Sequence, residues 1–176
     1  MSFFVDAAHF VRRPFLGFLW CFMRQFIPAP SGRQRFNVLG ALHATSQHLV
    51  TVTNETYINA LSVARLLCDL AVAYRNAPIT LVMDNARYQR CRLVRDLAMA
   101  LGIELLFLPP YSPNLNLIER LWKFVKKKCL YSAYYETFSD FQNAIVNCIA
   151  ETDGKHKQEL ASLLTLKFQT FENETL

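Results

Sequence analysis

Residues 79–108 read ITLVMDNARYQRCRLVRDLAMALGIELLFL, two short apolar runs around one amphipathic stretch. The runs at 79–83 and 103–108 have the length and composition of strands buried on both faces of a sheet. Between them, residues 89–101 have helical spacing and are followed by Gly102, a residue typical of the position after a helix. A strand, a helix and a second strand in this order predict two parallel strands joined by a right-handed crossover.

Further strand and helix patterns lie on either side of this unit. Earlier apolar runs predict strands over residues 2–10, 36–44 and 47–52, with a further short strand candidate at 15–22. Helical spacing of apolar residues, with Asn54 as the first N-cap, predicts helices over residues 56–75, 117–128, 138–150 and 158–168. The leading strands can form an antiparallel meander beside the parallel pair. The predicted fold class is therefore α/β, with a mixed five-stranded sheet and helices on both faces.

The composition is that of one folded domain. Of the 176 residues, 52% are hydrophobic and 19% are charged, so a sizeable core is expected and intrinsic disorder is not. The 5 cysteines are widely spaced without a C-x-x-C pair, which predicts thiols of a reducing compartment and neither a zinc site nor a disulfide framework. The longest apolar stretch, residues 15–27, is interrupted by Arg24 and is too short to span a membrane. Because a secretory pattern is also lacking, we expect a soluble cytoplasmic protein with no membrane partner.

Charge is distributed unevenly along the chain. Residues 1–130 carry 16 of the 19 basic side chains and 7 of the 14 acidic ones, whereas residues 131–176 carry 3 basic and 7 acidic side chains. A basic body followed by an acidic segment predicts a polyanionic partner, such as nucleic acid, on one part of the surface. The alternative is ordinary solubility charge with a lopsided distribution. We expect a catalytic core over residues 1–130 and a C-terminal helical extension of the same domain over residues 131–176.

Three carboxylates stand where the predicted sheet would bring them together. Asp6 interrupts the first apolar strand, Asp84 ends the strand at 79–83, and Glu119 opens the helix at 117–128. Carboxylates in apolar surroundings are costly unless something compensates them, and three that converge repel one another. Oxygen ligands favour Mg²⁺ or Mn²⁺, and two such ions can activate water and stabilise the leaving 3′ oxygen of a phosphodiester. The pattern therefore predicts a two-metal site that acts on nucleic acid.

Each carboxylate also has a plainer interpretation. Asp6 could face solvent on an edge strand, and Asp84 could form an Asx turn with Asn85. Glu119 could be the N3 residue of a capping box that begins at Asn116, or pair with a lysine one helical turn later. Each signal is weak when taken alone. The joint placement of the three carboxylates on this order of elements favours the metal site.

The chain resembles the catalytic domain of DDE transposases of the mariner superfamily, in its bacterial insertion-sequence branch. The resemblance is carried by VMDNA at residues 82–86 and by LPPYSPNLNLIERLW at residues 108–122. Between Asp84 and Glu119 lie 34 residues, the spacing that this group uses between its second and third acidic residues. Residues 4–9, FVDAAH, resemble the first acidic strand of the family, and residues 37–42, NVLGAL, the strand after it. The resemblance covers about residues 2–130 and implies a ribonuclease H-like fold.

The resemblance implies DNA transposition, in which metal-dependent phosphodiester hydrolysis is followed by strand transfer. Asp6, Asp84 and Glu119 would be the catalytic residues and the ligands of two Mg²⁺ or Mn²⁺ ions. The implied partners are transposon ends and target DNA with a TA dinucleotide, bound by a homodimer in the bacterial cytoplasm or on the nucleoid. The residues also allow a ribonuclease H-like nuclease or resolvase without strand transfer, and a catalytically idle remnant that only binds DNA.

Three features depart from the family pattern. Gln89 stands where the family often has His, and Leu117 stands where it often has Pro. Neither position is a carboxylate, so neither argues against activity. No helix-turn-helix module precedes the first strand, so we expect a separate end-binding chain or a truncated gene product.

Other polar residues are expected to support the carboxylates. The candidates for holding the phosphate backbone are the basic residues that follow Glu119 and Asp84: Lys123, Lys126, Lys127 and Arg87. The alternative for the lysines is a solvated helix face in which they complement the helix dipole. His9 and Asn85 are expected to contact Asp6 and Asp84, respectively.

Overall fold

The computed structural model describes residues 1–12, 22, 34–110, 112–131 and 133–168. Its strands are β1 (Ser2–Val11), β2 (Arg35–His43), β3 (Leu49–Asn54), β4 (Ile79–Met83) and β5 (Ile103–Phe107). Its α-helices are α1 (Ala60–Ala73), α2 (Arg92–Ala100), α3 (Leu117–Cys129), α4 (Phe138–Ala150) and α5 (Lys157–Leu163). No helix within these ranges is long and apolar enough to cross a membrane. The strand expected over residues 15–22 lies outside the described residues, apart from residue 22.

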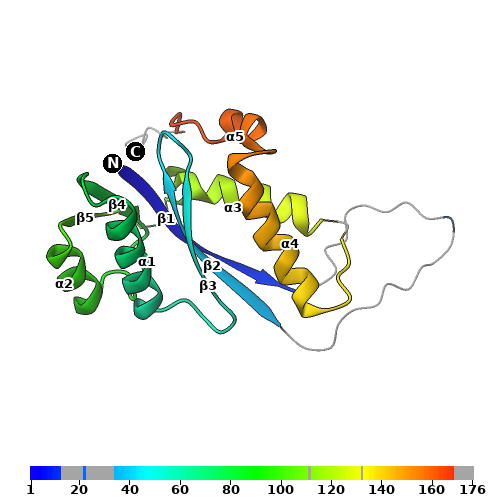
Figure 1. Cartoon of the computed structure of the whole chain (residues 1–176), viewed down its shortest axis with the longest axis horizontal. Helices are drawn as coiled ribbons and strands as arrows, with labels where there is room; N and C mark the ends of the chain where they lie inside the picture. The colour runs from blue at the N-terminus through cyan, green and yellow to red at the C-terminus, as the bar shows by residue number, and fades with distance from the viewer. Residues whose placement is uncertain (13–21, 23–33, 111, 132, 169–176) are drawn as a thin grey trace, which may run out of the picture.

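The five strands form one mixed sheet in the order β3-β2-β1-β4-β5 (Figure 1). β1, β2 and β3 form an antiparallel meander. β4 pairs in parallel with β1, and β5 pairs in parallel with β4. The predicted mixed sheet is thus confirmed, and β1 is its central strand.

Alternate residues of β1 contribute to two hydrophobic cores, one on each face of the sheet. Phe3 and Val5 pack with α1 and α2, whereas Phe4 and Phe10 pack with α3, α4 and α5. Figure 1 shows α1 and α2 on one side of the sheet and α3 and α4 on the other, which confirms the prediction of helices on both faces. Because side chains alternate along a strand, Asp6 lies on the same face as Phe4, the face covered by α3.

The helix α1 begins later than the sequence predicts. Its N-cap is Asn59, whose side chain accepts hydrogen bonds from backbone N–H groups of the first turn. Asn54, the predicted N-cap, instead ends β3 and closes the following turn, where the Thr56 backbone N–H donates to Asn54 Oδ1 (3.0 Å). The prediction was wrong because Asn54 is already engaged: the buried Asn37 amide donates to the same oxygen (3.2 Å).

Two other helices are shorter than predicted. α2 begins at Arg92, because Gln89 is buried in the turn that follows β4. α5 ends at Leu163, and the chain beyond it is held in a non-helical course by the Arg120 guanidinium, which donates to the carbonyl oxygens of Leu163, Thr165 and Lys167. Both α4 and α5 contribute to the core that includes α3. The division of the chain at residue 130 stays a prediction.

Candidate active site

Asp6 and Asp84 lie next to each other where β1 and β4 stop pairing. The parallel register aligns Val5 with Met83, so the next residues along the two strands are Asp6 and Asp84. Neighbouring strands lie about 4.8 Å apart, which puts the two backbones within reach of a shared ligand. The edge-strand interpretation of Asp6 is wrong, because β1 is the central strand and the side chain is partly buried.

Glu119 reaches the same region from α3. It lies in the first turn of that helix, which packs across β1 and β2. The residues that flank it in the helix, Ile118 and Trp122, are buried over Gly40, and Gly40 is the cross-strand partner of Asp6. The sheet register and the docking of α3 therefore direct all three predicted carboxylates toward one place.

The pKa of Asp6 reflects the proximity of Glu119 and Asp84. Burial, together with the negative charges of Glu119 and Asp84, raises the pKa of Asp6 from its ordinary value of 3.8 to about 7. The Ala7 backbone N–H and the Lys126 ammonium act in the opposite direction. A carboxyl group shifted this far by burial and neighbouring charge is typical of a functional site.

Asn116 connects α3 to the ends of both strands. Its side chain is 1% exposed, and its amide donates hydrogen bonds to the Val5 carbonyl oxygen (3.2 Å) and to Asp84 Oδ1 (3.3 Å). Although Asn116 is the N-cap of α3, its side chain makes no capping hydrogen bond. The capping-box interpretation of Glu119 is therefore wrong: Asn116 holds Asp84 against β1 instead of closing its own helix.

The carboxylates converge without forming a closed ligand sphere. Over the part of the chain that the structure describes, no group of three or more His, Cys, Asp or Glu side chains is arranged to hold a metal ion. A further acceptor, Asn116 Oδ1, is buried beside Asp84 and has no hydrogen-bond partner among the described residues. This set of hard oxygen donors fits a divalent cation such as Mg²⁺ or Mn²⁺.

A family model described as DDE superfamily endonuclease matches residues 4–142. The chain belongs to this family. The matched region contains Asp6, Asp84 and Glu119 and confirms the resemblance at the level of the family, whereas the insertion-sequence branch stays a prediction.

The proteins to which this DDE family member is similar include one curated protein and several solved structures. The Sinorhizobium fredii "Uncharacterized protein y4pE/y4sA" is 31% identical over 74 residues, which are 42% of this chain and 50% of the relative. A pre-cleavage Mos1 transpososome aligns with a TM-score of 0.65 at 14% identity, over 97% of this chain and 57% of the Mos1 chain. A Mos1 mariner paired-end complex with Mn aligns with a TM-score of 0.62 at 16% identity, over 97% and 56% of the two chains. The alignments confirm the ribonuclease H-like fold, and the chain spans about half the length of these relatives.

Tyr88 is a neighbour of the carboxylates that the sequence did not single out. Burial, followed by the negative charges of Asp6 and Asp84, raises the pKa of its phenol to about 12, while the Gln89 side chain acts in the opposite direction. Gln89, at the position where the DDE family often has His, is 1% exposed, and within the described part of the chain its Oε1 has no hydrogen-bond partner. The turn after β4 thus brings a protonated phenol to this end of the sheet. Its only signal in the sequence is its place four residues after Asp84.

The structure does not bring His9 to Asp6. Residues three apart on a strand point to opposite faces, and His9 Nδ1 pairs with Asn37 Oδ1 (2.7 Å) on the face covered by α1. Asn85 follows Asp84 directly and Arg87 comes three residues after it; both side chains are exposed in the segment after β4.

The lysines of α3 differ in their surroundings. Lys126 is partly buried; its charge lowers the pKa of Asp6, and its Nζ lies 5.8 Å from the centroid of the Phe10 ring. Lys123 and Lys127 are exposed. Lys128 points toward α5, where its Nζ pairs with Glu159 Oε2 (2.9 Å). Lys123, Lys126 and Lys127 are therefore available to a ligand near the carboxylates, whereas Lys128 is paired with Glu159.

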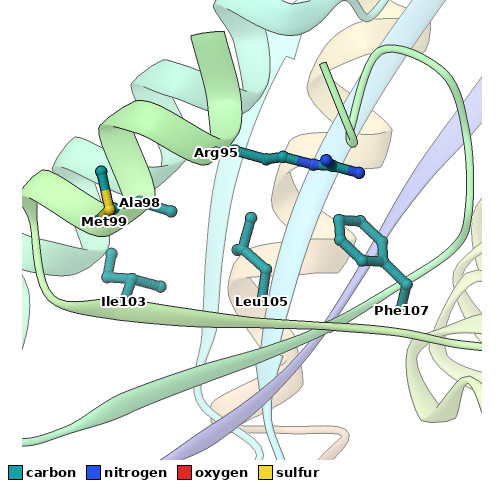
Figure 2. A pocket seen from close by; sticks show the side chains of 6 residues that line it. All are labelled: Arg95, Ala98, Met99, Ile103, Leu105 and Phe107. Atoms are coloured by element: carbon teal, nitrogen blue, oxygen red, sulfur yellow. The ribbon is translucent and has the colours of Figure 1, made fainter. Parts of the chain in front are cut away.

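A hollow of about 390 Å³ lies between α2 and β5, apart from the carboxylates. Figure 2 shows the side chains of Ile103 and Leu105 rising from β5 toward α2, the helix that carries Ala98 and Met99, with Arg95 extending from α2 toward Phe107. The lining is apolar except for that arginine and contains none of the predicted site residues. We therefore place the active site at Asp6 and not in this hollow.

The raised pKa of Asp6 makes the stability of the metal-free protein depend on pH. Because the folded state binds this proton more tightly than the unfolded chain, the contribution is full below about pH 4 and is lost as the pH rises through about 7. Urea unfolding in the presence of a chelator should show a falling free energy of unfolding across this range. The Asp6→Asn variant should lack this part of the pH dependence. An equal pH dependence of the free energy of unfolding in both proteins would contradict the raised pKa of Asp6.

Proposed function

We propose that this chain is the catalytic domain of a DNA transposase. It cleaves phosphodiester bonds at transposon ends by metal-dependent hydrolysis and then joins the freed 3′ end to target DNA. The observation that carries the proposal is the placement of Asp6, Asp84 and Glu119 at one end of the sheet in a member of the DDE endonuclease family. The fold shared with Mos1 complexes supports it.

Asp6, Asp84 and Glu119 would hold two divalent ions, Mg²⁺ or Mn²⁺. When bound, such ions lower the pKa of a water molecule and stabilise the charge on the leaving 3′ oxygen. Asn116 donates to Asp84 Oδ1 and thereby orients that carboxylate. Tyr88 keeps its proton at neutral pH and can donate a hydrogen bond to a phosphate oxygen near the carboxylates.

The DNA backbone would enter along α3. Lys126 beside Asp6, with Lys123 and Lys127 exposed on the same helix, supplies positive charge next to the carboxylates. Arg87, exposed after Asp84, extends this surface on the side of β4. The partners would be transposon ends and TA-containing target DNA, bound by a homodimer in the bacterial cytoplasm, with a separate helix-turn-helix chain reading the ends.

DNA affinity should fall steeply with salt, because lysine contacts to phosphates release counterions. We expect the slope of log affinity against log salt to flatten by about one unit for each of Lys123, Lys126 and Lys127 changed to Gln. Lys128→Gln is the matched control, since this lysine is paired with Glu159 and should leave the slope unchanged. Fluorescence anisotropy on one duplex across a salt series measures both. If the slope is the same in the wild type and in the three Lys→Gln variants, these lysines do not contact the DNA phosphates.

Strand transfer is the reaction that distinguishes this function from related ones. The full chain is incubated with Mn²⁺, a labelled duplex that carries a free 3′-OH, and a supercoiled plasmid. We expect both plasmid nicking and covalent joining of the label to the plasmid. Nicking without joining would instead indicate a nuclease or resolvase, and the absence of both reactions, with DNA binding retained, a catalytically idle remnant.

A further inference from the structure

Gly40 lies beneath α3 at the position directly opposite Asp6 in the antiparallel β1–β2 pair. A Cβ atom at this position would lie 2.7 Å from Trp122 Cζ2, 2.9 Å from Trp122 Cη2 and 3.0 Å from Ile118 Cδ1. Carbon atoms in favourable contact are about 3.5–4.0 Å apart. The helix therefore approaches the sheet more closely here than any residue with a side chain would allow.

Trp122 is held in the core by packing contacts with its neighbours. Its indole is 3% exposed, and Nε1 has no hydrogen-bond partner in the part of the chain that the structure describes. The ring stands edge-on to Phe10, with centroids 6.4 Å apart and an interplanar angle of 88°. Because none of the described residues forms a hydrogen bond with the indole N–H, we infer that the depth of the ring depends on the bare backbone at Gly40 and on the Phe10 ring.

The same two side chains determine where Glu119 stands. Ile118 precedes Glu119 directly, and Trp122 follows it by about one helical turn. A helix turn is rigid, so a displacement of these two residues away from β2 displaces the Glu119 carboxylate with them. The opposing strand residue, Asp6, stays in β1.

We propose that Gly40 is a positioning residue, whose missing side chain sets the depth at which α3 docks and thereby holds Glu119 within range of Asp6. The inference rests on the proposed function, because the position of Glu119 matters for binding only when the carboxylates share a metal ion. It assigns a role in the site to a strand residue that carries no functional group.

Binding of Mn²⁺ to the full chain, followed by the loss of the free-ion electron paramagnetic resonance signal, tests this role without requiring catalysis. We expect Gly40→Ala to fold and to bind Mn²⁺ about tenfold more weakly, or worse, because ligands held out of position lose affinity. The double variant Gly40→Ala/Trp122→Leu removes both ring atoms that clash and should recover most of that affinity. Gly154→Ala is the matched control, since a Cβ there meets only a backbone oxygen at 3.9 Å and the affinity should be unchanged.

Recovery in the double variant supports the proposal even if Gly40→Ala alone fails to fold. Wild-type affinity in a folded Gly40→Ala, or a folded double variant that does not recover, would overturn it. A crystal structure of Gly40→Ala gives a second readout that is independent of metal: we expect α3 to have moved away from β2, and an unmoved helix would overturn the inference. If the wild-type chain binds no Mn²⁺ at the carboxylates, the proposed function fails. The position of α3 in the crystal structure of Gly40→Ala then still tests whether Gly40 sets the depth at which this helix docks.

Discussion

Asp84→Asn and Glu119→Gln should fold like the wild type and lose Mg²⁺-dependent DNA nicking by about a thousandfold or more. Both changes keep the shape of the side chain and remove its negative charge. A metal ion contributes several kcal/mol to the stabilisation of the transition state, and each 1.36 kcal/mol is about a factor of ten in rate. Because α3 has no capping box for Glu119 to complete, we expect Glu119→Gln to change the free energy of unfolding by no more than about 0.5 kcal/mol.

The matched controls are exposed carboxylates elsewhere on the surface. Asp96→Asn disrupts only an exposed pair with Arg92, and Glu159→Gln only the pair with Lys128. Both should nick DNA at the wild-type rate in the same assay. Nicking that survives in a folded Glu119→Gln variant would contradict its role as a ligand, and thermal midpoints without metal show which variants are folded.

Asn116→Ala should damage both the fold and the metal site. The variant leaves the Val5 carbonyl oxygen and Asp84 Oδ1 without the amide that now donates to them at 3.2 and 3.3 Å. A buried polar group left without a partner costs about 1–3 kcal/mol, so the free energy of unfolding should fall by an amount of that order. Loss of a residue that orients a metal ligand typically weakens metal affinity by about 10- to 100-fold, and we expect such a loss for Mn²⁺.

A control for this change is Asn143→Ala, which alters an exposed asparagine of α4. It should leave Mn²⁺ affinity unchanged. If Asn116→Ala lowered stability while binding Mn²⁺ as tightly as the wild type, Asn116 would be a structural residue only. Urea unfolding and a Mn²⁺ titration of the same preparations separate these outcomes.

The arrangement of the sheet could be predicted because the deciding patterns are local. The apolar runs that became β4 and β5 are too short for helices and flank one amphipathic helix, which leaves parallel pairing as the simple solution. The face of His9 could also have been predicted, since residues three apart on a strand cannot both point toward α3. The choice between Asn54 and Asn59 as the N-cap of α1 could not be predicted, because it depends on the buried Asn37 side chain, which donates a hydrogen bond to Asn54.

Only part of the candidate site could be predicted from the sequence. Asp6, Asp84 and Glu119 stand out as charges in apolar elements, and their nearness follows from the predicted order of strands. The roles of Asn116 and Gly40 could not be predicted from the order of strands, because both roles depend on how closely α3 docks on β1 and β2. Asn116 looks like an ordinary N-cap until the docked helix turns its side chain toward Asp84. Helix docking of this kind depends on tertiary packing, which no local pattern encodes.

The central claim is that Asp6, Asp84 and Glu119 share divalent metal ions. The most direct measurement is a crystal of the full chain soaked in Mn²⁺, with anomalous difference density recorded at the manganese edge. We predict density bounded by the three carboxylates in the wild type, and its loss in Asp84→Asn. Manganese bound only elsewhere on the chain, or density that persists unchanged in Asp84→Asn, would contradict the account.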